Sequence, residues 1–138
     1  MSNLEYSHYE GYGDYAFETY RYSQAVRVPP NRVECSGQGG WDPKTGKCLE
    51  TWQEQIDQAF ANVDLTLKTA GVKDGFKSVF SIKSYHVGTI DSTVLEAMIG
   101  NLKKYAPGHK PIWTMLGVAT LALPEMKVEI DVVAIDEK

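Results

Sequence analysis

The chain has 138 residues, of which 43% are hydrophobic and 23% charged, and its formal net charge at pH 7 is -4. These values are typical of one soluble globular domain, and the length is too short for two domains with cores of their own. The acidic balance disfavours a nucleic-acid partner, because phosphate binding needs net or locally concentrated positive charge.

The sequence predicts neither a membrane partner nor export. No apolar run approaches the length of a membrane span. The start of the chain, MSNLEYSHYEGYGDY, lacks the basic and apolar regions of a signal peptide. We therefore expect a cytoplasmic protein.

Tyrosine is concentrated at the N-terminus, where six of the eight tyrosines lie within the first 22 residues. Gly11 and Gly13 interrupt them, and aliphatic residues are few, so we predict neither a core helix nor a clean strand. Two interpretations stay open: a loosely docked terminus, or an aromatic arm that folds over a neighbouring surface. We treat residues 1–21 as this N-terminal arm and residues 22–138 as a single domain.

The spacing of apolar residues after the arm predicts strands and two amphipathic helices. We expect Gly71 to end the first helix, and Thr93 with Glu96 to form a capping box at the start of the second. The order predicts an α+β fold in which a mixed sheet carries two helices on one face. The predicted elements are a strand at 32–36, a helix at 51–70, a strand at 77–87, a helix from about residue 91, and strands at 112–121 and 126–135.

The stretch ECSGQGGWDPKTGKC (34–48) holds both cysteines and four glycines. It matches neither the GxxxxGK[ST] phosphate loop nor the GxGxxG dinucleotide motif. Cys35 and Cys48 lack CxxC spacing and the histidines are scattered, so we predict buried free thiols, no metal and no cofactor. Glycines just beyond a strand allow something to approach the backbone closely. We interpret this segment as a strand edge that faces a ligand or another chain.

Several motifs in order resemble the Rid family, the YjgF-like reactive intermediate deaminases also called L-PSP endoribonucleases. They are YSQAVR (22–27), CSGQGGWDPKTG (35–46), QAFANVDLTLKTAG (58–71), HKPIWTM (109–115), and a Leu-Pro turn before VEIDVVAI (128–135). The resemblance covers most of the chain, from about Tyr22 to Ile135. It implies a chorismate-mutase-like (YjgF/L-PSP) α+β fold and a homotrimer, with a small-molecule cleft between each pair of adjacent subunits.

The same resemblance implies the site residues. Tyr22 and Glu129 correspond to catalytic positions, with Glu129 as the acidic residue that positions water. The glycine-rich wall and the β-strand after Lys110-Pro111 correspond to substrate-binding positions. The substrate-binding residues implied in this way are Ser36, Gly37, Trp41, Trp113 and Thr114.

Trp113 is the departure that matters. Deaminating members of the family have an arginine there that clamps the carboxylate of an imino or enamino acid, and an indole has one N–H donor and no charge. A second family position, an asparagine, falls at Ile99, although Asn101 is close by. Arg27 is the candidate for a replacement clamp.

Two classes of function remain open. The first is an enzyme that hydrolyses an imine or enamine, or catalyses a tautomerisation or elimination, with Glu129 as acid/base and Tyr22 stabilising an oxyanion or enol. The alternative is a non-catalytic trimeric ligand-binding or chaperone-like protein, in which Trp113 fills a vestigial cleft and Glu129 pairs across the trimer interface. An endoribonuclease is disfavoured, because the chain is acidic and has no catalytic pair of histidines.

Overall fold

Within residues 2–137, the part of the chain that this computed structural model describes, seven strands form one mixed sheet. The elements are β1 (Glu5–Ser7), α1 (Tyr12–Tyr20), β2 (Ala25–Val28), β3 (Arg32–Cys35), β4 (Gln38–Gly39), α2 (Trp52–Thr69), the 3₁₀ helix η1 (Gly75–Ser78), β5 (Val79–Val87), α3 (Ser92–Tyr105), β6 (Ile112–Val118) and β7 (Val128–Ile135). The strand order is β1-β2-β3-β7-β5-β6, and β4 also pairs with β7. Strands β5 and β6 run parallel, and the other pairs are antiparallel.

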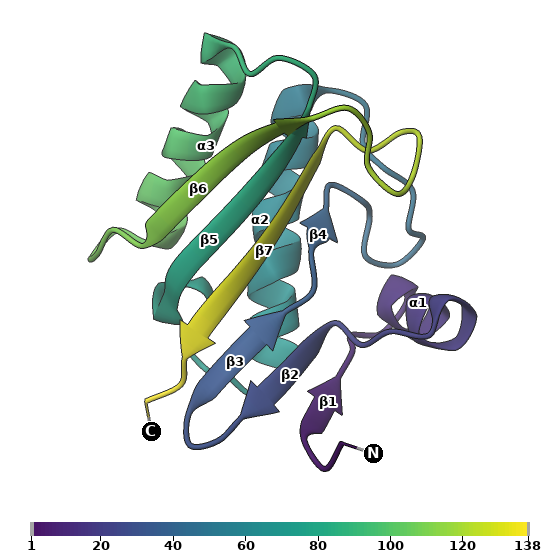
Figure 1. The fold of residues 1–138 in the computed structure, drawn as a ribbon, viewed down its shortest axis with the longest axis vertical. Helices are drawn as coiled ribbons and strands as arrows, with labels where there is room; N and C mark the ends of the chain where they lie inside the picture. The colour runs from purple at the N-terminus through teal and green to yellow at the C-terminus, as the bar shows by residue number, and fades with distance from the viewer. Residues whose placement is uncertain (1, 138) are drawn as a thin grey trace.

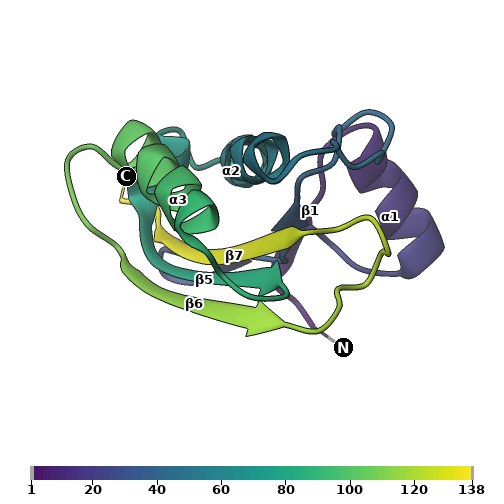
Figure 2. The ribbon, with the colours of Figure 1, turned by 90° about the horizontal axis from the view of Figure 1, so that it is seen from above.

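Helices α2 and α3 cover one face of the sheet, whereas the other face is bare (Figures 1 and 2). This arrangement confirms the predicted α+β fold with a mixed sheet and two helices on one face. Helix α1 is a third helix, which lies at the β1 end of the sheet. None of the helices within residues 2–137 is long and apolar enough to cross a membrane.

Strand β7 lies inside the sheet and separates its two faces by alternation. Val128, Ile130 and Val132 are buried in the core beneath the helices. Because successive side chains of a strand point to opposite faces, Glu129 and Asp131 point to the bare face. The position of Glu129 on that face follows from burial of its two neighbours.

The two long helices begin and end where the sequence offers caps. Thr51 accepts the Glu54 N–H in a reciprocal capping box that starts α2, and Gly71 follows its end with φ of 93°. The capping box predicted at Thr93 is wrong, because Asp91 is the N-cap of α3. Its Oδ1 accepts a 3.0 Å hydrogen bond from the Val94 N–H.

The N-terminal arm forms the short strand β1 and the helix α1, neither of which the sequence predicted. Tyr9 is 2% exposed; its hydroxyl donates to Oε1 of Gln38 at 3.0 Å and accepts from Nε1 of Trp41 at 2.9 Å. The Tyr12 amide donates to the Pro43 carbonyl at 2.6 Å. The arm is therefore docked on the glycine-rich segment of its own chain by polar contacts and by the packing of Tyr9 and Tyr12 in a hydrophobic cluster with Trp41 and Met126.

Replacement of Asn62 by alanine tests how this segment is held. Asn62 is fully buried in α2, and its Nδ2 donates to the carbonyls of Gly39 at 2.9 Å and Trp41 at 2.8 Å. Asn62→Ala leaves these carbonyls unpaired and is expected to lower the free energy of unfolding by about 2–4 kcal/mol. Urea unfolding measures the loss, with Gln53→Ala as the control because Gln53 bonds Asp57 on the exposed face of the same helix. Equal losses in the two variants would contradict the assignment.

His86 is expected to make stability depend on pH. It is 1% exposed, its Nδ1 has no hydrogen-bond partner within residues 2–137, and burial lowers its pKa to about 4. The unfolded chain takes up a proton below the ordinary pKa of 6.5, whereas the folded chain stays neutral until about pH 4. The contribution is therefore full above pH 6.5 and is lost as the pH falls to 4, a difference of about 3 kcal/mol.

Urea unfolding at several values of pH checks this dependence. The variant His86→Gln cannot titrate in this range, so its free energy of unfolding is expected to fall less steeply below pH 6.5. Identical slopes for the variant and the parent chain would show that another group carries the dependence.

Candidate functional site

A cavity of about 360 Å³ collects most of the residues predicted for the site, and we call it the Glu129 cavity. Strand β7 supplies Glu129, the link between α1 and β2 supplies Tyr22, and the turn between β3 and β4 supplies the glycine-rich wall. Its volume lies in the range of small-molecule sites. The predicted residues that line it are Tyr22, Ser36, Gly37, Trp41 and Glu129.

Glu129 is the one carboxylate that lines this cavity. It accepts no hydrogen bond and forms no ion pair within residues 2–137, although it is half-buried. Burial raises its pKa, and the Asp131 carboxylate on the same face of β7 raises it further. An unpaired carboxylate with a raised pKa at a cavity wall is better suited to accept and return a proton than an exposed carboxylate would be.

Gly37 makes room for that carboxylate. A Cβ atom at residue 37 would overlap Oε2 of Glu129, so any larger residue would displace the side chain. Gly46 serves the same segment differently: its φ is 78°, and a Cβ there would overlap the ring of Tyr12. The glycine-rich segment thus allows a carboxylate and an aromatic ring of its own chain to approach the backbone closely, whereas the sequence predicted the close approach of a ligand or another chain.

Two hydroxyl groups lie beside Glu129. Burial raises the pKa of Tyr22, and the nearby Glu129 carboxylate adds to that effect, so the phenol stays neutral and can donate. The hydroxyl and the amide of Ser36 both donate within the chain, to the carbonyls of Ser23 and Gln24, each at 2.7 Å. The Ser36 oxygen can therefore accept from a ligand, but its donors are occupied in this structure.

Trp41 is a fixed wall of the cavity. It is 3% exposed, and its Nε1 donates to the Tyr9 hydroxyl at 2.9 Å. The ring of Tyr12 packs on it, with ring centres 4.9 Å apart. Tyr12 and Tyr20 of α1 also line the cavity, and the sequence analysis did not assign them to the site. The concentration of tyrosines at the N-terminus was the feature of the sequence that could have indicated them.

Trp113 and Thr114 do not line the Glu129 cavity. Trp113 lies on the edge strand β6 on the helix-covered face, where its Nε1 donates to the Ser84 hydroxyl at 2.9 Å. It lines a separate cavity of about 640 Å³ together with Ile99, the residue at which the sequence analysis expected a second difference from the family. Thr114 is exposed and alternates to the bare face. A single chain therefore does not bring Trp113 to Glu129.

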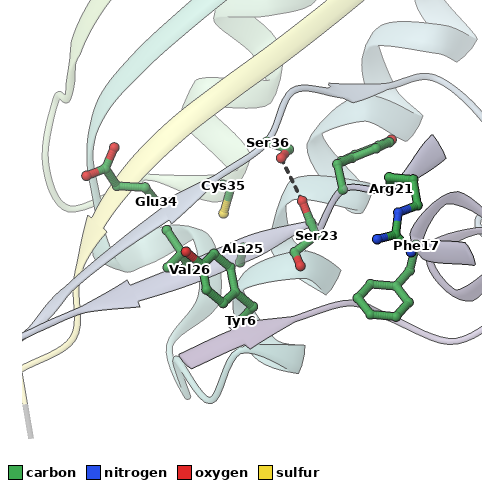
Figure 3. Close-up of a pocket in the computed structure, with 10 residues that line it drawn as sticks. Tyr6, Phe17, Arg21, Ser23, Ala25, Val26, Glu34, Cys35 and Ser36 are labelled. Carbon is green, nitrogen blue, oxygen red and sulfur yellow. Dashed lines mark hydrogen bonds between the residues drawn. The ribbon is translucent and has the colours of Figure 1, made fainter. Parts of the chain in front are cut away.

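The three arginines of the chain differ in what they contact. Arg27, the candidate clamp, donates to Asp136 at 2.8 Å and to the Ala70 carbonyl at 3.0 Å. It is therefore held near the end of α2 and does not line the Glu129 cavity. Arg32 pairs with Glu34 at 3.0 Å on the surface. Arg21, which no motif assigns to the site, lines a cavity of about 590 Å³ that we call the Arg21 cavity (Figure 3).

The residues that could hold a metal are dispersed. Within residues 2–137, no three His, Cys, Asp or Glu side chains gather into a possible metal site. Cys35 is buried, and burial raises the pKa of its thiol to about 12, which makes a poor nucleophile. Cys48 is half-buried, so of the two thiols predicted to be buried only Cys35 is fully so.

Comparison with known proteins agrees with this geometry. The family model described as Endoribonuclease L-PSP matches residues 16–136. A RutC family protein of Aquifex aeolicus (strain VF5) is 35% identical over 114 residues, which cover 83% of this chain and 87% of that protein.

Two solved structures share the fold. RidA of the Antarctic bacterium Psychrobacter sp. PAMC 21119 has a TM-score of 0.72 and 27% identity, covering 83% of this chain and 87% of its own. Protein YJGH has a TM-score of 0.71 and 31% identity, with coverage of 88% and 89%. Because the family match and the curated relative each span most of the chain, the protein belongs to the Rid/YjgF family, the family described as Endoribonuclease L-PSP.

Proposed function

We propose that this protein is an enzyme that acts by acid/base chemistry on a small organic molecule, and that Glu129 is the acid/base. The observation that carries the proposal is an unpaired, partly buried carboxylate at the wall of an open cavity. A structural carboxylate at such a position would be expected to have a partner, because burial of an unpaired charge costs stability.

Hydrolysis of an imine is the reaction that this geometry supports best. Ionised Glu129 removes a proton from a water molecule as its oxygen bonds to the C=N carbon. The proton then passes to nitrogen, and collapse of the carbinolamine releases an amine or ammonia and leaves a carbonyl. The neutral Tyr22 phenol can donate to the oxygen or nitrogen on which charge develops. Tautomerisation of an enamine needs the same proton transfers without water.

We further propose that the protein acts as a homotrimer with a cleft between adjacent subunits. The bare face of the sheet carries exposed apolar side chains, among them Phe80, Ile112 and Leu116. Ile112 and Leu116 lie on the edge strand β6 and Phe80 on the neighbouring β5, and exposed apolar residues of this kind are typical of a surface that another chain covers. In this assembly the outward-pointing residues of β6, Thr114 among them, would face the neighbouring copy, whereas Trp113 stays on the helix-covered face of its own chain.

The alternative functions have less support. A vestigial site filled by tryptophan is not favoured within one chain, since Trp113 leaves the Glu129 cavity open. Ribonuclease chemistry would need basic groups along a groove. Arg21 is the one basic residue among those that line the Glu129 and Arg21 cavities.

Glu129→Gln separates a catalytic role from a structural one. The uncharged amide is expected to lower imine hydrolysis at least about 100-fold, as for loss of a general acid/base. It should not lower the free energy of unfolding at pH 7, because the ionised side chain is buried without a partner. The assay follows imines of leucine and phenylalanine formed in situ by an amino-acid oxidase, alongside urea unfolding. A stability loss without loss of activity would make Glu129 structural.

Gly37→Ala is the matched variant that keeps the carboxylate but moves it. The added Cβ would displace Oε2 of Glu129, so activity should fall while the acid limb of the pH–rate profile shifts. Gly100→Ala is the control, because a Cβ at this site in α3 meets nothing within 4 Å. Full activity of Gly37→Ala would contradict the proposed position of the carboxylate.

Leu116→Asp tests the assembly. Leu116 is 44% exposed on the bare face, and a charge there is expected to convert a trimer into monomers. Leu95→Asp is the control, because Leu95 is 40% exposed but belongs to α3 on the opposite side of the sheet. Light scattering during size-exclusion chromatography gives the mass of each species. A monomeric parent chain, or a Leu116→Asp variant that stays trimeric, would refute the proposed interface.

A further inference from the structure

Arg21 differs from the other two arginines because its guanidinium has no protein partner. Arg27 and Arg32 each form an ion pair, with Asp136 and Glu34. Arg21 forms no hydrogen bond and no ion pair within residues 2–137. Its fork of N–H donors matches an oxyanion.

The backbone at Arg21 is held in an unfavourable conformation. Arg21 is the C-cap of α1 with φ of 66° and ψ of 38°, and it is the one non-glycine residue with positive φ among residues 2–137. This left-handed position normally favours glycine or asparagine. Strain of this kind is concentrated at functional sites, where it sets the direction of a side chain.

The Arg21 cavity has the composition of a site for an apolar anion. Tyr6 and Phe17 supply aromatic surface, and Figure 3 shows Arg21 beside Phe17 at one end of the cavity, with Glu34 at the other. Glu34 is already paired with Arg32, so the charge available to a ligand is that of Arg21. An aromatic or branched apolar body would fit beside a carboxylate bound at the guanidinium.

The Arg21 cavity adjoins the Glu129 cavity. Tyr22 and Ser36 line both of them, and Arg21 directly precedes Tyr22 in the chain. A ligand held at Arg21 can therefore extend past Tyr22 toward the Glu129 carboxylate. Its acid group would enter from the side of the N-terminal arm rather than from β6, where Trp113 has replaced the clamping arginine.

We propose that Arg21 is the carboxylate-binding residue of this protein, and that it selects ligands with an apolar, aromatic-sized body. The inference rests on the proposed function in one respect, namely that the bound molecule is the one that reacts at Glu129. It assigns to the N-terminal arm a role in specificity, since α1 and the residue that ends it supply both the charge and part of the aromatic surface.

A pair of isosteric probes tests the charge requirement directly. We would titrate 3-phenylpropanoate and its neutral amide, 3-phenylpropanamide, and follow both by ligand-observed NMR. The parent chain is expected to bind the carboxylate more tightly than the amide. In Arg21→Gly the carboxylate affinity should fall about 10- to 100-fold, as for loss of a charge-assisted hydrogen-bonded pair, while the amide affinity stays the same.

The controls separate charge from folding. Glycine suits φ of 66°, so Arg21→Gly should not lower the melting temperature, and Lys44→Ala removes an equal charge at an exposed position that lines neither cavity. Arg21→Lys, which keeps the charge but not the fork, should recover part of the affinity. Equal binding of the two probes by the parent chain, or unchanged carboxylate binding in Arg21→Gly, would overturn the proposal.

The two proposals fail in different ways. Arg21-dependent carboxylate binding without any imine hydrolysis would leave this inference standing and refute the proposed function. Imine hydrolysis that needs Glu129 but is indifferent to Arg21→Gly would refute this inference alone. Carboxylate binding by Glu129→Gln should match or exceed that of the parent chain, because a nearby negative charge is removed.

Discussion

The alternation of β7 is the constraint on which the rest of the site depends. Four of its residues, Val128, Ile130, Val132 and Ala134, are fully or almost fully buried on the helix-covered face, and this burial fixes which way every intervening side chain points. A shift of the register by one residue would expose the core and bury Glu129 among aliphatic groups. The energy that holds the sheet to its helices therefore also holds the carboxylate at the cavity, with no dedicated contact to position it.

The glycine-rich segment adds the second wall, and it is held by buried polar contacts as well as by the packing of Trp41 against Tyr12 and Met126. Asn62 of α2 binds two of its carbonyls, and Tyr9 of the arm links Gln38 to Trp41. Buried amides and hydroxyls of this kind cost free energy unless every partner is in place, so they specify one conformation. Helix α2, the arm and the segment thus form one network, and the Glu129 carboxylate lies against the only kind of residue that leaves it room.

The sequence predicted the fold because periodicity and most caps are local properties, whereas the residues around Glu129, which lie far apart in the chain, were grouped only by the resemblance to the family. It did not predict α1 or β1, since Tyr9 and Tyr12 are held by partners some 30 positions away, about which local spacing says nothing. It grouped Trp113 with Glu129 because a sequence motif does not show to which face of the sheet a side chain points. Only the register of β6 on β5 shows that Trp113 points to the helices, with Ile82 and Val132. The positive φ of Arg21 could likewise not be predicted from the residues that flank it in the sequence.

The arm changes the position from which a negative charge can approach the site. An exposed residue in the left-handed region costs about 1–2 kcal/mol that glycine would avoid, and within residues 2–137 the Arg21 guanidinium forms no hydrogen bond or ion pair that would offset that cost. Binding of an anionic ligand by the Arg21 guanidinium would offset this conformational cost. If Arg21 binds the carboxylate of the ligand as proposed, the tryptophan at residue 113 and the unpaired guanidinium of Arg21 have one explanation. Glu129 stays where β7 places it, and the bound acid group lies on the side of the N-terminal arm instead of at β6.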